Sequence, residues 1–460
     1  MNMMNALERR STFALSSIFA LRMLGLFMII PVFAVEGQSY EYATPALIGL
    51  AVGVYGLSQS ILQIPFSLWA DRFSRKPLVV LGLLLFAIGG AVAAMSHTIY
   101  GVIIGRAIAG GGAVSAVVMA LLADVTREEH RTKAMAAMGM SIGLSFVVAF
   151  SIGPWLTGLV GISGLFWVTA IMGVLAIFTL LLVPKTTRHH RNFQQGYLHQ
   201  LKQVLQMPDL NRLHVSIFSL HLLLTAMFIY VPSQLIQYAG IPLAKHGLVY
   251  LPLLLLGIIF SFPSIILAEK YRKMRGIFLT AIVGVILGLV VLTFGATSKY
   301  LLLLGLGLFF VAFNVMEALL PSWLSKSAPI QSKATAMGVN ASAQFLGAFV
   351  GGTLGGQLLT LHSTSTGWAI LTAIAILWCI IGFGLKQPRY LSSLIIRLPE
   401  EDSAEQTTQG LTTELLEIKG VEEVVIMSEQ KVAYVKLDKK VIDEDGRQRL
   451  TQLFGKELVI

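Results

Sequence analysis

Long apolar segments alternate with short polar connections over the first 386 residues. Most apolar segments have about twenty residues or more, the length an α-helix needs to cross a hydrocarbon core of roughly 30 Å. The pattern therefore predicts an all-α membrane protein with about twelve transmembrane helices. These predicted spans cover residues 13–35, 45–70, 78–96, 99–122, 134–160, 163–183, 212–238, 246–268, 277–297, 300–324, 333–360 and 366–385.

Composition supports this class, since 55% of residues are hydrophobic and only 13% are charged, against roughly a quarter in soluble domains. Cations gather in every second connection, and the alternate connections hold few. By the positive-inside rule, both termini and the long middle loop are cytoplasmic. The net charge of +10 thus reports topology, and we expect no nucleic-acid partner. The basic connections carry Arg9, Arg10, Arg72, Arg75, Lys76, Arg127, Arg131, Lys133, Lys185, Arg188, Arg191, Lys270, Arg272, Lys273, Arg275, Lys386 and Arg389.

The chain divides into four parts. A polar stretch at 184–211, with apolar positions at helical spacing, predicts a cytoplasmic linker with an amphipathic helix between six-span units 1–183 and 212–386. Ala120–Gly139 resembles Ala318–Gly338, which indicates a duplicated unit with a binding site at the interface between the halves.

Residues 387–460 change abruptly in composition and carry more acids than bases. Their pattern predicts β-α-β-β-α-β, a cytoplasmic α+β domain of the ferredoxin-like type. In this order the predicted segments are Leu394–Pro399, Asp402–Ile418, Val421–Met427, Val432–Leu437, Ile442–Phe454 and Glu457–Ile460. The single cysteine, Cys379, excludes an internal disulfide and a Cys-x-x-Cys metal site, and we expect no bound metal.

The connection Ser67–Pro77 combines an acid with three cations, Asp71, Arg72, Arg75 and Lys76. Asp71 ends the second span, where its carboxylate could accept hydrogen bonds from the free N–H groups of a helix that begins near Lys333.

The cations are expected to pair with Asp124 or with the inner leaflet. Glu269 is the counterpart of Asp71 in the second half.

These residues resemble the signature loop of the major facilitator superfamily, although Ser67 and Ser74 stand where the family usually has glycine. Arg106 in RAIAGGGAV resembles the family's arginine linked to proton coupling. SFVVAFSIGPWLTG, with Gly153 and Pro154, resembles the motif of the antiporter branch, and these two residues favour a bent, closely packed span.

The chain is thus similar to the proton-dependent drug exporters of this superfamily, of which a subgroup carries a small C-terminal YAM domain. The resemblance implies two pseudo-symmetric six-helix bundles in a bacterial inner membrane. It also implies that Asp71 holds the halves together, and that the proton gradient drives transport without a cofactor.

Ionisable residues inside predicted spans are functional candidates because burying a charge is costly. Glu317 and His221 are the expected proton carriers, tuned by Arg22 and Arg106. Two structural alternatives remain open, a buried ion pair at Glu317 or Arg106 and a histidine bonded to a backbone carbonyl at His221.

The expected substrate cavity is mostly apolar with few polar anchors, which suits lipophilic or amphipathic small molecules. Its residues are Tyr55, Gln59, Gln63, Phe228, Asn314, Asn340 and Gln344.

We therefore expect a transporter and not an enzyme, one that exchanges protons for a lipophilic compound. Two alternatives stay open, cotransport or facilitated diffusion of a polar metabolite, and a membrane sensor without transport. The acidic tail is expected to dock on basic connections such as Lys270–Arg275, or to self-associate through exposed strand edges.

Overall fold

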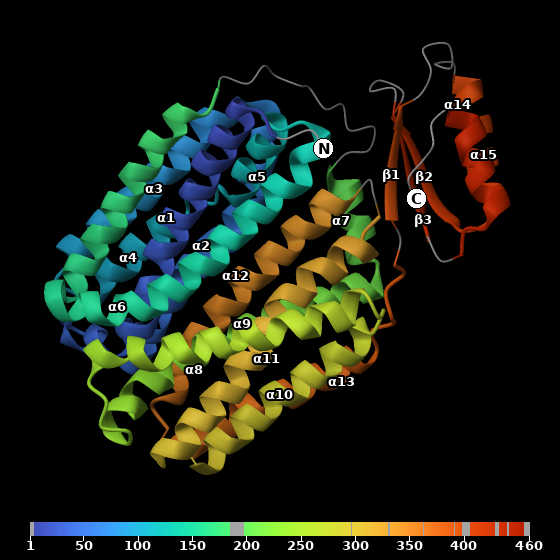
Figure 1. The fold of residues 1–460 in the computed structure, drawn as a ribbon. Helices are drawn as coiled ribbons and strands as arrows, with labels where there is room; N and C mark the ends of the chain where they lie inside the picture. Colours follow the sequence, from blue (N-terminus) through green and yellow to red (C-terminus); the bar gives the residue numbers. More distant parts are fainter. Residues whose placement is uncertain are drawn as a thin grey trace.

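The protein consists of a bundle of long helices and a small α/β domain beside it, as the computed structural model in Figure 1 shows. The structure describes residues 4–184, 197–295, 297–329, 332–361, 363–390, 392–397, 405–427, 432–438 and 441–454. In the bundle the helices are α1 (Ala6–Glu36), α2 (Pro45–Arg72), α3 (Arg75–Met95), α4 (Ile99–Gly110), α5 (Ser115–Asp124), α6 (Glu128–Thr179), α7 (Tyr197–Leu205), α8 (Pro208–Gln237), α9 (Gly247–Glu269), α10 (Met274–Gly295), α11 (Lys299–Ser327), α12 (Lys333–Leu358) and α13 (Thr364–Phe383).

Ten helical segments among the described residues are long and apolar enough to cross a membrane. The difference from twelve has two causes. The predicted spans 134–160 and 163–183 share α6, whose two helical parts meet at Gly161 without a loop and count as one segment. α12 is rich in glycine and polar residues, so it does not count among the ten. All twelve predicted spans nevertheless fall on helices.

The chain reverses direction inside α6 without a loop. Ser141 bonds to Ser16 and Gly153 lies against Met28, whereas Thr169 bonds back to Gly25. The turn occurs at Gly161, whose φ of 69° and ψ of 177° are far from helical values. Such a backbone conformation favours glycine because a Cβ is disfavoured there.

The predicted fourth span is two helices, not one. α4 ends at Gly110, backbone turns follow through Gly111–Val114, and α5 begins at Ser115. Consecutive glycines at 110–112 destabilise the helix interior, and Gly112 packs against the backbone of Gly82 in α3. The break is thus local to the Gly-rich segment.

α12 joins the two halves of the bundle, packing against α2 on one side and α8 on the other. A Cβ at Gly49 would lie 2.3 Å from the Gly352 carbonyl oxygen, and one at Gly356 2.4 Å from that of Pro45. Glycine therefore permits backbone contact between the halves. This α2–α12 junction continues to Ser60, whose hydroxyl donates to the Ser342 carbonyl at 3.0 Å.

The linker helix of the sequence analysis corresponds to α7, and residues 185–196 of that prediction lie outside the described residues. Val204 is fully buried, and Gln200 accepts a hydrogen bond from Thr335 of α12 at 2.9 Å. The helix thus packs against the bundle.

The tail contains β1 (Ser392–Arg397), α14 (Glu405–Glu417), β2 (Val421–Met427), β3 (Val432–Leu437) and α15 (Glu444–Phe454). The strands form an antiparallel sheet in the order β1-β3-β2 around a core that includes Leu415, Val435 and Leu450. The predicted element order is present as far as it is described. The final strand, 457–460, lies outside the described residues.

Candidate functional site

Three side chains from three helices meet in the second half: His221 on α8, Glu317 on α11 and Gln344 on α12. The His221 Nε2 lies 2.7 Å from the Gln344 Nε2 and 3.6 Å from a Glu317 carboxylate oxygen. The other Glu317 oxygen is 3.5 Å from the Gln344 amide nitrogen. The sequence predicted each of these residues separately, and the fold brings them into one cluster.

The second ring nitrogen of His221 fixes its hydrogen-bonding state. Nδ1 lies 3.1 Å from the Ile217 carbonyl oxygen, so it carries a hydrogen and donates. In the neutral ring Nε2 then has only a lone pair and accepts from Gln344. The contact with a backbone carbonyl, which was the structural alternative for His221, is present, and its role as a proton carrier stays a prediction.

A second histidine on α8, His214, was missed by the sequence analysis. It is buried, and its Nδ1 lies 3.4 Å from Asn340 of α12. His214 and His221 are seven residues apart, two helical turns, so they face the same neighbouring helix. That spacing is the signal that the sequence offered.

Arg22 lies in the first half, away from this cluster. Its guanidinium donates to the Ser115 hydroxyl at 2.9 Å, the Tyr55 hydroxyl at 3.0 Å and the Gln59 amide oxygen at 2.5 Å. Two predicted cavity residues, Tyr55 and Gln59, thus bind Arg22. Gln63, one turn further on α2, is also buried.

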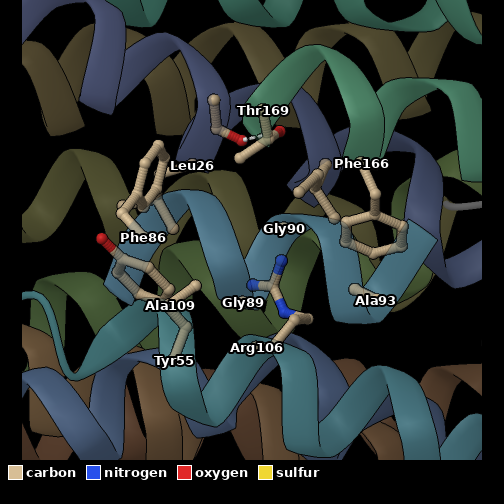
Figure 2. Close-up of a pocket in the computed structure, with 12 residues that line it drawn as sticks. Leu26, Tyr55, Phe86, Gly89, Gly90, Ala93, Arg106, Ala109, Phe166 and Thr169 are labelled. Atoms are coloured by element: carbon tan, nitrogen blue, oxygen red, sulfur yellow. Dashed lines mark hydrogen bonds between the residues drawn. The ribbon is translucent and has the colours of Figure 1, made fainter. Parts of the chain in front are cut away.

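Arg106 binds the backbone of α2 and makes no ion pair with any described acid. The Arg106 Nε donates to the Ala51 carbonyl, and its Nη2 donates to the Val52 carbonyl at 3.0 Å. The guanidinium carbon lies 5.9 Å from the centre of the Tyr55 ring. Figure 2 shows Arg106 among the residues that line a small pocket, together with Gly89 and Gly90 of α3 and Phe166 of α6.

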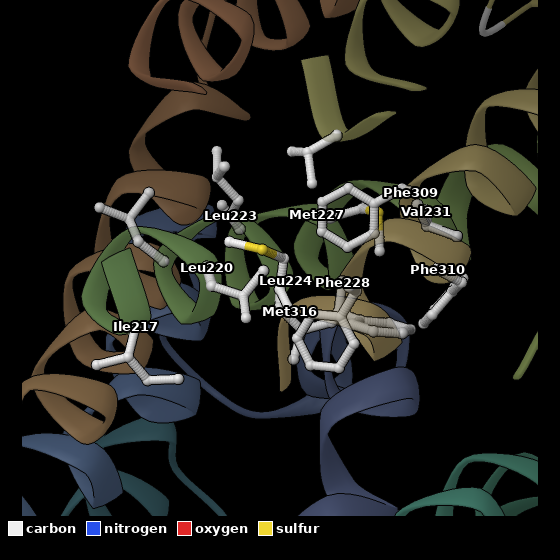
Figure 3. Packing of buried hydrophobic residues seen from close by; sticks show 14 of the residues in the cluster. Ile217, Leu220, Leu223, Leu224, Met227, Phe228, Val231, Phe309, Phe310 and Met316 are labelled. Atoms are coloured by element: carbon white, nitrogen blue, oxygen red, sulfur yellow. The ribbon is translucent and has the colours of Figure 1, made fainter. Parts of the chain in front are cut away.

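An aromatic cluster closes the space between the halves. Phe150 of α6 packs on Phe228 of α8 at 4.6 Å between ring centres, and Phe146 stacks on Phe313 of α11 at 5.9 Å. Phe228 is fully buried among α8 and α11 side chains (Figure 3). It therefore fills this region of the interface.

The remaining residues predicted within spans have packing contacts. Asn314 donates to the Phe310 carbonyl at 2.8 Å and touches Gly257 of α9. At Gly153 a Cβ would lie 2.9 Å from the Met28 carbonyl oxygen, so α6 approaches α1 closely there, next to Pro154 within the helix.

Charged residues tie the helix ends of the first half together. Arg75 at the start of α3 pairs with Asp124 at the end of α5, and Lys76 donates to the Val183 carbonyl. Asp71 and Arg72 end α2 and their side chains lie outside the described residues. The role of Asp71 at α12 stays a prediction, although α12 does begin at Lys333.

The second half also has a charged pair between helix ends, but there the residue from the end of α11 is the cation and its partner is the acid. Glu269 at the end of α9 accepts a hydrogen bond from Ser322 and pairs with Lys326 of α11 at 3.0 Å.

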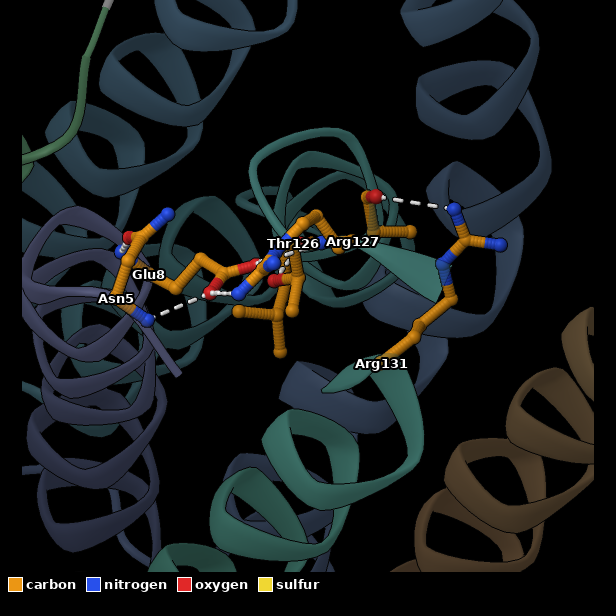
Figure 4. Close-up of polar contacts among 7 residues, drawn as sticks. Asn5, Glu8, Thr126, Arg127 and Arg131 are labelled. Atoms are coloured by element: carbon orange, nitrogen blue, oxygen red, sulfur yellow. Dashed lines mark hydrogen bonds and ion pairs between the residues drawn. The ribbon is translucent and has the colours of Figure 1, made fainter. Parts of the chain in front are cut away.

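Glu8 was not among the predicted residues and forms the most elaborate contact of this group. Its carboxylate binds the backbone N–H of Arg127 at 3.0 Å and the guanidinium at 3.0 and 3.1 Å, and it caps the Asn5 N–H at 2.8 Å (Figure 4). This side chain is 3% exposed. It links the first turn of α1 to the first turn of α6.

The tail contacts the connection between α9 and α10. Asp438 pairs with Arg272 through two bonds of 2.6 and 3.1 Å, and Lys436 donates to the Ala328 carbonyl at 3.1 Å. The Asp438 carboxylate raises the pKa of Arg272. Tyr390, which lies just before β1, donates a hydrogen bond to the Ala268 carbonyl at 2.7 Å. The acidic tail thus contacts the basic connection expected from the sequence.

Comparison with known proteins finds two matching families. Residues 15–352 match the Major Facilitator Superfamily, and residues 394–445 match the YajR YAM domain. The inner membrane transport protein YajR of Escherichia coli (strain K12) is 43% identical over 436 residues, which cover 94% of this chain and 95% of the relative. Multidrug resistance protein 2 of Bacillus subtilis (strain 168) is 26% identical over 360 residues, 76% of this chain and 88% of the relative.

Solved structures show the same helical architecture. A bacterial homologue of the human lysosomal transporter Spinster, inward-facing and occupied, aligns with a TM-score of 0.68 at 13% identity, over 82% of this chain and 97% of that one. The D-xylose-proton symporter aligns with a TM-score of 0.67 at 16% identity, over 81% and 97%. These relatives and structures are transporters. The chain belongs to the major facilitator superfamily, as a multi-pass membrane transporter with a C-terminal YAM domain.

Proposed function

We propose that this protein exchanges protons for lipophilic or amphipathic small molecules by alternating access, as an efflux transporter of the bacterial inner membrane. Twelve spans in two six-helix bundles would place both termini and the ferredoxin-like tail in the cytoplasm. The observation that carries the proposal is the His221–Glu317–Gln344 cluster. Its side chains come from three helices, and one of these helices forms the junction with the other half.

Protonation of His221 would change its contact with α12. The proton enters at Nε2, which then becomes a donor and can no longer accept from Gln344. The new N–H faces Glu317, 3.6 Å away, and an imidazolium favours that carboxylate. The Gln344 amide must then turn its oxygen toward the ring.

This change acts on the helix that separates during transport. Gln344 lies on α12 between Ser342 and Phe345, both of which touch α2. A proton-dependent contact at Gln344 can therefore bias the α2–α12 junction, which is the requirement for coupling protonation to a change of access. The Glu317 side chain is 41% exposed, which leaves it a route to solvent.

The experiment is flux in proteoliposomes with an imposed pH gradient. Wild type should expel at least one of two lipophilic probes, the cation ethidium or the anion 8-anilinonaphthalene-1-sulfonate, against its gradient when protons flow the other way. Glu317→Gln and His221→Ala should each lose at least ~10-fold of gradient-driven flux, while Asp209→Asn, at an acid of the α8 start that pairs with Arg212, should keep it. Full response to the gradient in both variants would overturn the assignment.

Two other functions give different results in the same vesicles. Cotransport moves protons in the same direction as the substrate, so substrate entry acidifies the lumen, whereas exchange alkalinises it. Facilitated diffusion shows no response to the gradient, and a sensor shows no flux.

We further propose that tail docking regulates transport through the Arg272–Asp438 pair. This pair joins the YAM domain to the connection that follows α9, whose last residue, Glu269, contacts α11, the helix of Glu317. Removing residues 391–460 should change the dependence of flux on salt, because partly exposed ion pairs are screened. Identical flux across salt concentrations in both proteins would exclude regulation by this contact.

A further inference from the structure

Arg22 is a buried cation whose described partners are all neutral. Its side chain is 2% exposed, and it bonds to Ser115, Tyr55 and Gln59. No described carboxylate forms an ion pair with it. A buried guanidinium stays charged because arginine does not lose its proton in proteins, so its charge requires compensation from elsewhere.

The groups around Arg22 present unused hydrogen-bond donors. The Arg22 Nε and the Gln59 Nε2 are buried without a partner among the described residues. The Tyr55 and Ser115 hydroxyl oxygens accept from Arg22, which leaves their hydrogens free to donate. Four donor groups from three helices therefore lack an acceptor, which is the environment that an anion binds.

The surroundings add positive charge. Arg106 lies over the Tyr55 ring and bonds only to carbonyls among the described residues. Two described acids of this half, Glu8 and Asp124, already pair with Arg127 and Arg75 at the helix ends. In the part of the first half that is described, the interior thus carries uncompensated cations.

Separation of the halves would give access to this cluster. Gln59 precedes Ser60, which bonds across to Ser342 of α12, and Tyr55 precedes Gly56, which touches the Phe345 carbonyl. The Arg22 cluster therefore lies directly behind the α2–α12 junction. When that junction opens, these donors face the space between the halves.

We propose that Arg22, with Tyr55, Gln59 and Ser115, binds the carboxylate of an amphipathic organic anion, and that such anions are the substrate class. This inference rests on the proposed function and narrows it. Phe27 lies five residues further along α1 and packs on Phe146 at 5.0 Å, so aromatic surface is available for the apolar body of the ligand.

The test compares two probes of equal shape, naphthalene-2-carboxylate and naphthalene-2-carboxamide. Their binding to the full-length protein is measured calorimetrically in nanodiscs without a pH gradient. Phosphatidylcholine discs exclude anionic lipid, and a second set with phosphatidylglycerol tests whether a lipid phosphate competes. Wild type should bind the carboxylate at least ~10-fold more tightly than the carboxamide, because a charge-assisted pair is stronger than a neutral bond.

Arg22→Gln should abolish this preference and leave carboxamide binding unchanged. The matched control is Arg449→Gln, an exposed arginine of α15, which should keep the preference. If Arg22→Gln does not fold, Arg22→Lys replaces it, and loss of the planar fork should reduce carboxylate affinity about threefold to tenfold.

An equal affinity of wild type for both probes, or an unchanged preference in a folded Arg22 variant, overturns the proposal. Competition by phosphatidylglycerol alone, without carboxylate binding, assigns the site to a lipid headgroup and also overturns it. Carboxylate binding without gradient-driven flux would contradict the proposed function and leave this site intact. Proton-driven flux without a preference for the carboxylate would contradict the Arg22 site and leave the proposed function intact.

Discussion

The two halves of the bundle surround the ionisable side chains of their helices in opposite ways. The first half holds Arg22 and Arg106, whose partners are neutral side chains and backbone carbonyls. The second half holds His221 beside Glu317. Arginine keeps its charge at every physiological pH, whereas histidine and a carboxylate can exchange protons. In the mechanism proposed above, the fixed charge of the first half would bind the ligand and the exchangeable charge of the second half would carry the proton.

This division depends on two halves that move as units, and the glycine junction is where they meet. Gly356→Val should have the largest effect, since a Cβ there would lie 2.4 Å from the Pro45 carbonyl oxygen. Overpacking of this kind costs about 1–3 kcal/mol. We expect a lower melting temperature and at least ~10-fold lower flux.

The matched control is Gly338→Val on the same helix, where nothing lies within 4 Å of the added Cβ. Thermal unfolding in detergent and vesicle flux measure both variants. Equal behaviour of the two substitutions would show that close contact at the junction is not required.

The proton-exchanging residues of the second half are tested at Gln344, the α12 residue that contacts His221 and Glu317. Gln344→Leu leaves the His221 Nε2 without its described hydrogen-bond partner, and an unsatisfied buried group costs about 1–3 kcal/mol. Because His221 contacts α12 through Gln344, loss of this amide should separate His221 from the α2–α12 junction, and we expect the pH profile of flux to shift.

Gln357→Leu, an exposed position at the far end of α12, should leave the profile in place. A parallel shift in both variants, or none in Gln344→Leu, would separate Gln344 from the coupling mechanism.

The stability of the first half should also depend on the Glu8–Arg127 pair at the start of α1. Glu8→Gln keeps the shape but removes the charge that holds Arg127, and we expect a loss of about 1–2 kcal/mol in unfolding free energy. The partly exposed pair Asp209–Arg212 within α8 serves as comparison, and Asp209→Asn should cost less than ~0.5 kcal/mol. Chemical denaturation measures both, and a larger loss for Asp209→Asn would reverse this ranking.

The smallest expected effect concerns the tail. Arg272→Gln removes a two-bond pair that is 29% and 17% exposed, which is worth about 0.5–1 kcal/mol. Limited proteolysis should then release the tail faster than in Arg449→Gln, whose pair with Asp445 lies within α15. Equal release rates would show that the remaining contacts hold the tail.

Local pattern predicted most of the helices and the tail strands, because both depend on periodicity and span length. The turn at Gly161 was predicted as a connection between two helices, since no sequence signal distinguishes one glycine that reverses a helix from an ordinary short loop. α12 was predicted from its length, although its glycines lower its hydropathy. Those same glycines form the junction.

Apart from the Arg75–Asp124 pair, the site was predicted as single residues. Glu317 and His221 stand out as charges in apolar segments, yet their meeting at Gln344 depends on the packing of three helices. Arg22 was assigned to proton coupling, whereas its contacts lie with Tyr55, Gln59 and Ser115. Glu8 had a local signal, because Asn5-x-x-Glu8 is a helix capping box, but its bond to Arg127 is tertiary.

The reversal at Gly161 has a practical consequence for mapping the protein in cells. Epitope tags and protease sites need several residues of accessible, unstructured chain, and this rim offers a single residue between two helices. An inserted peptide would have to unwind one of them. Labelling of this face should therefore use a small thiol reagent on a cysteine placed at exposed Val160, in a background where Cys379 is replaced by serine.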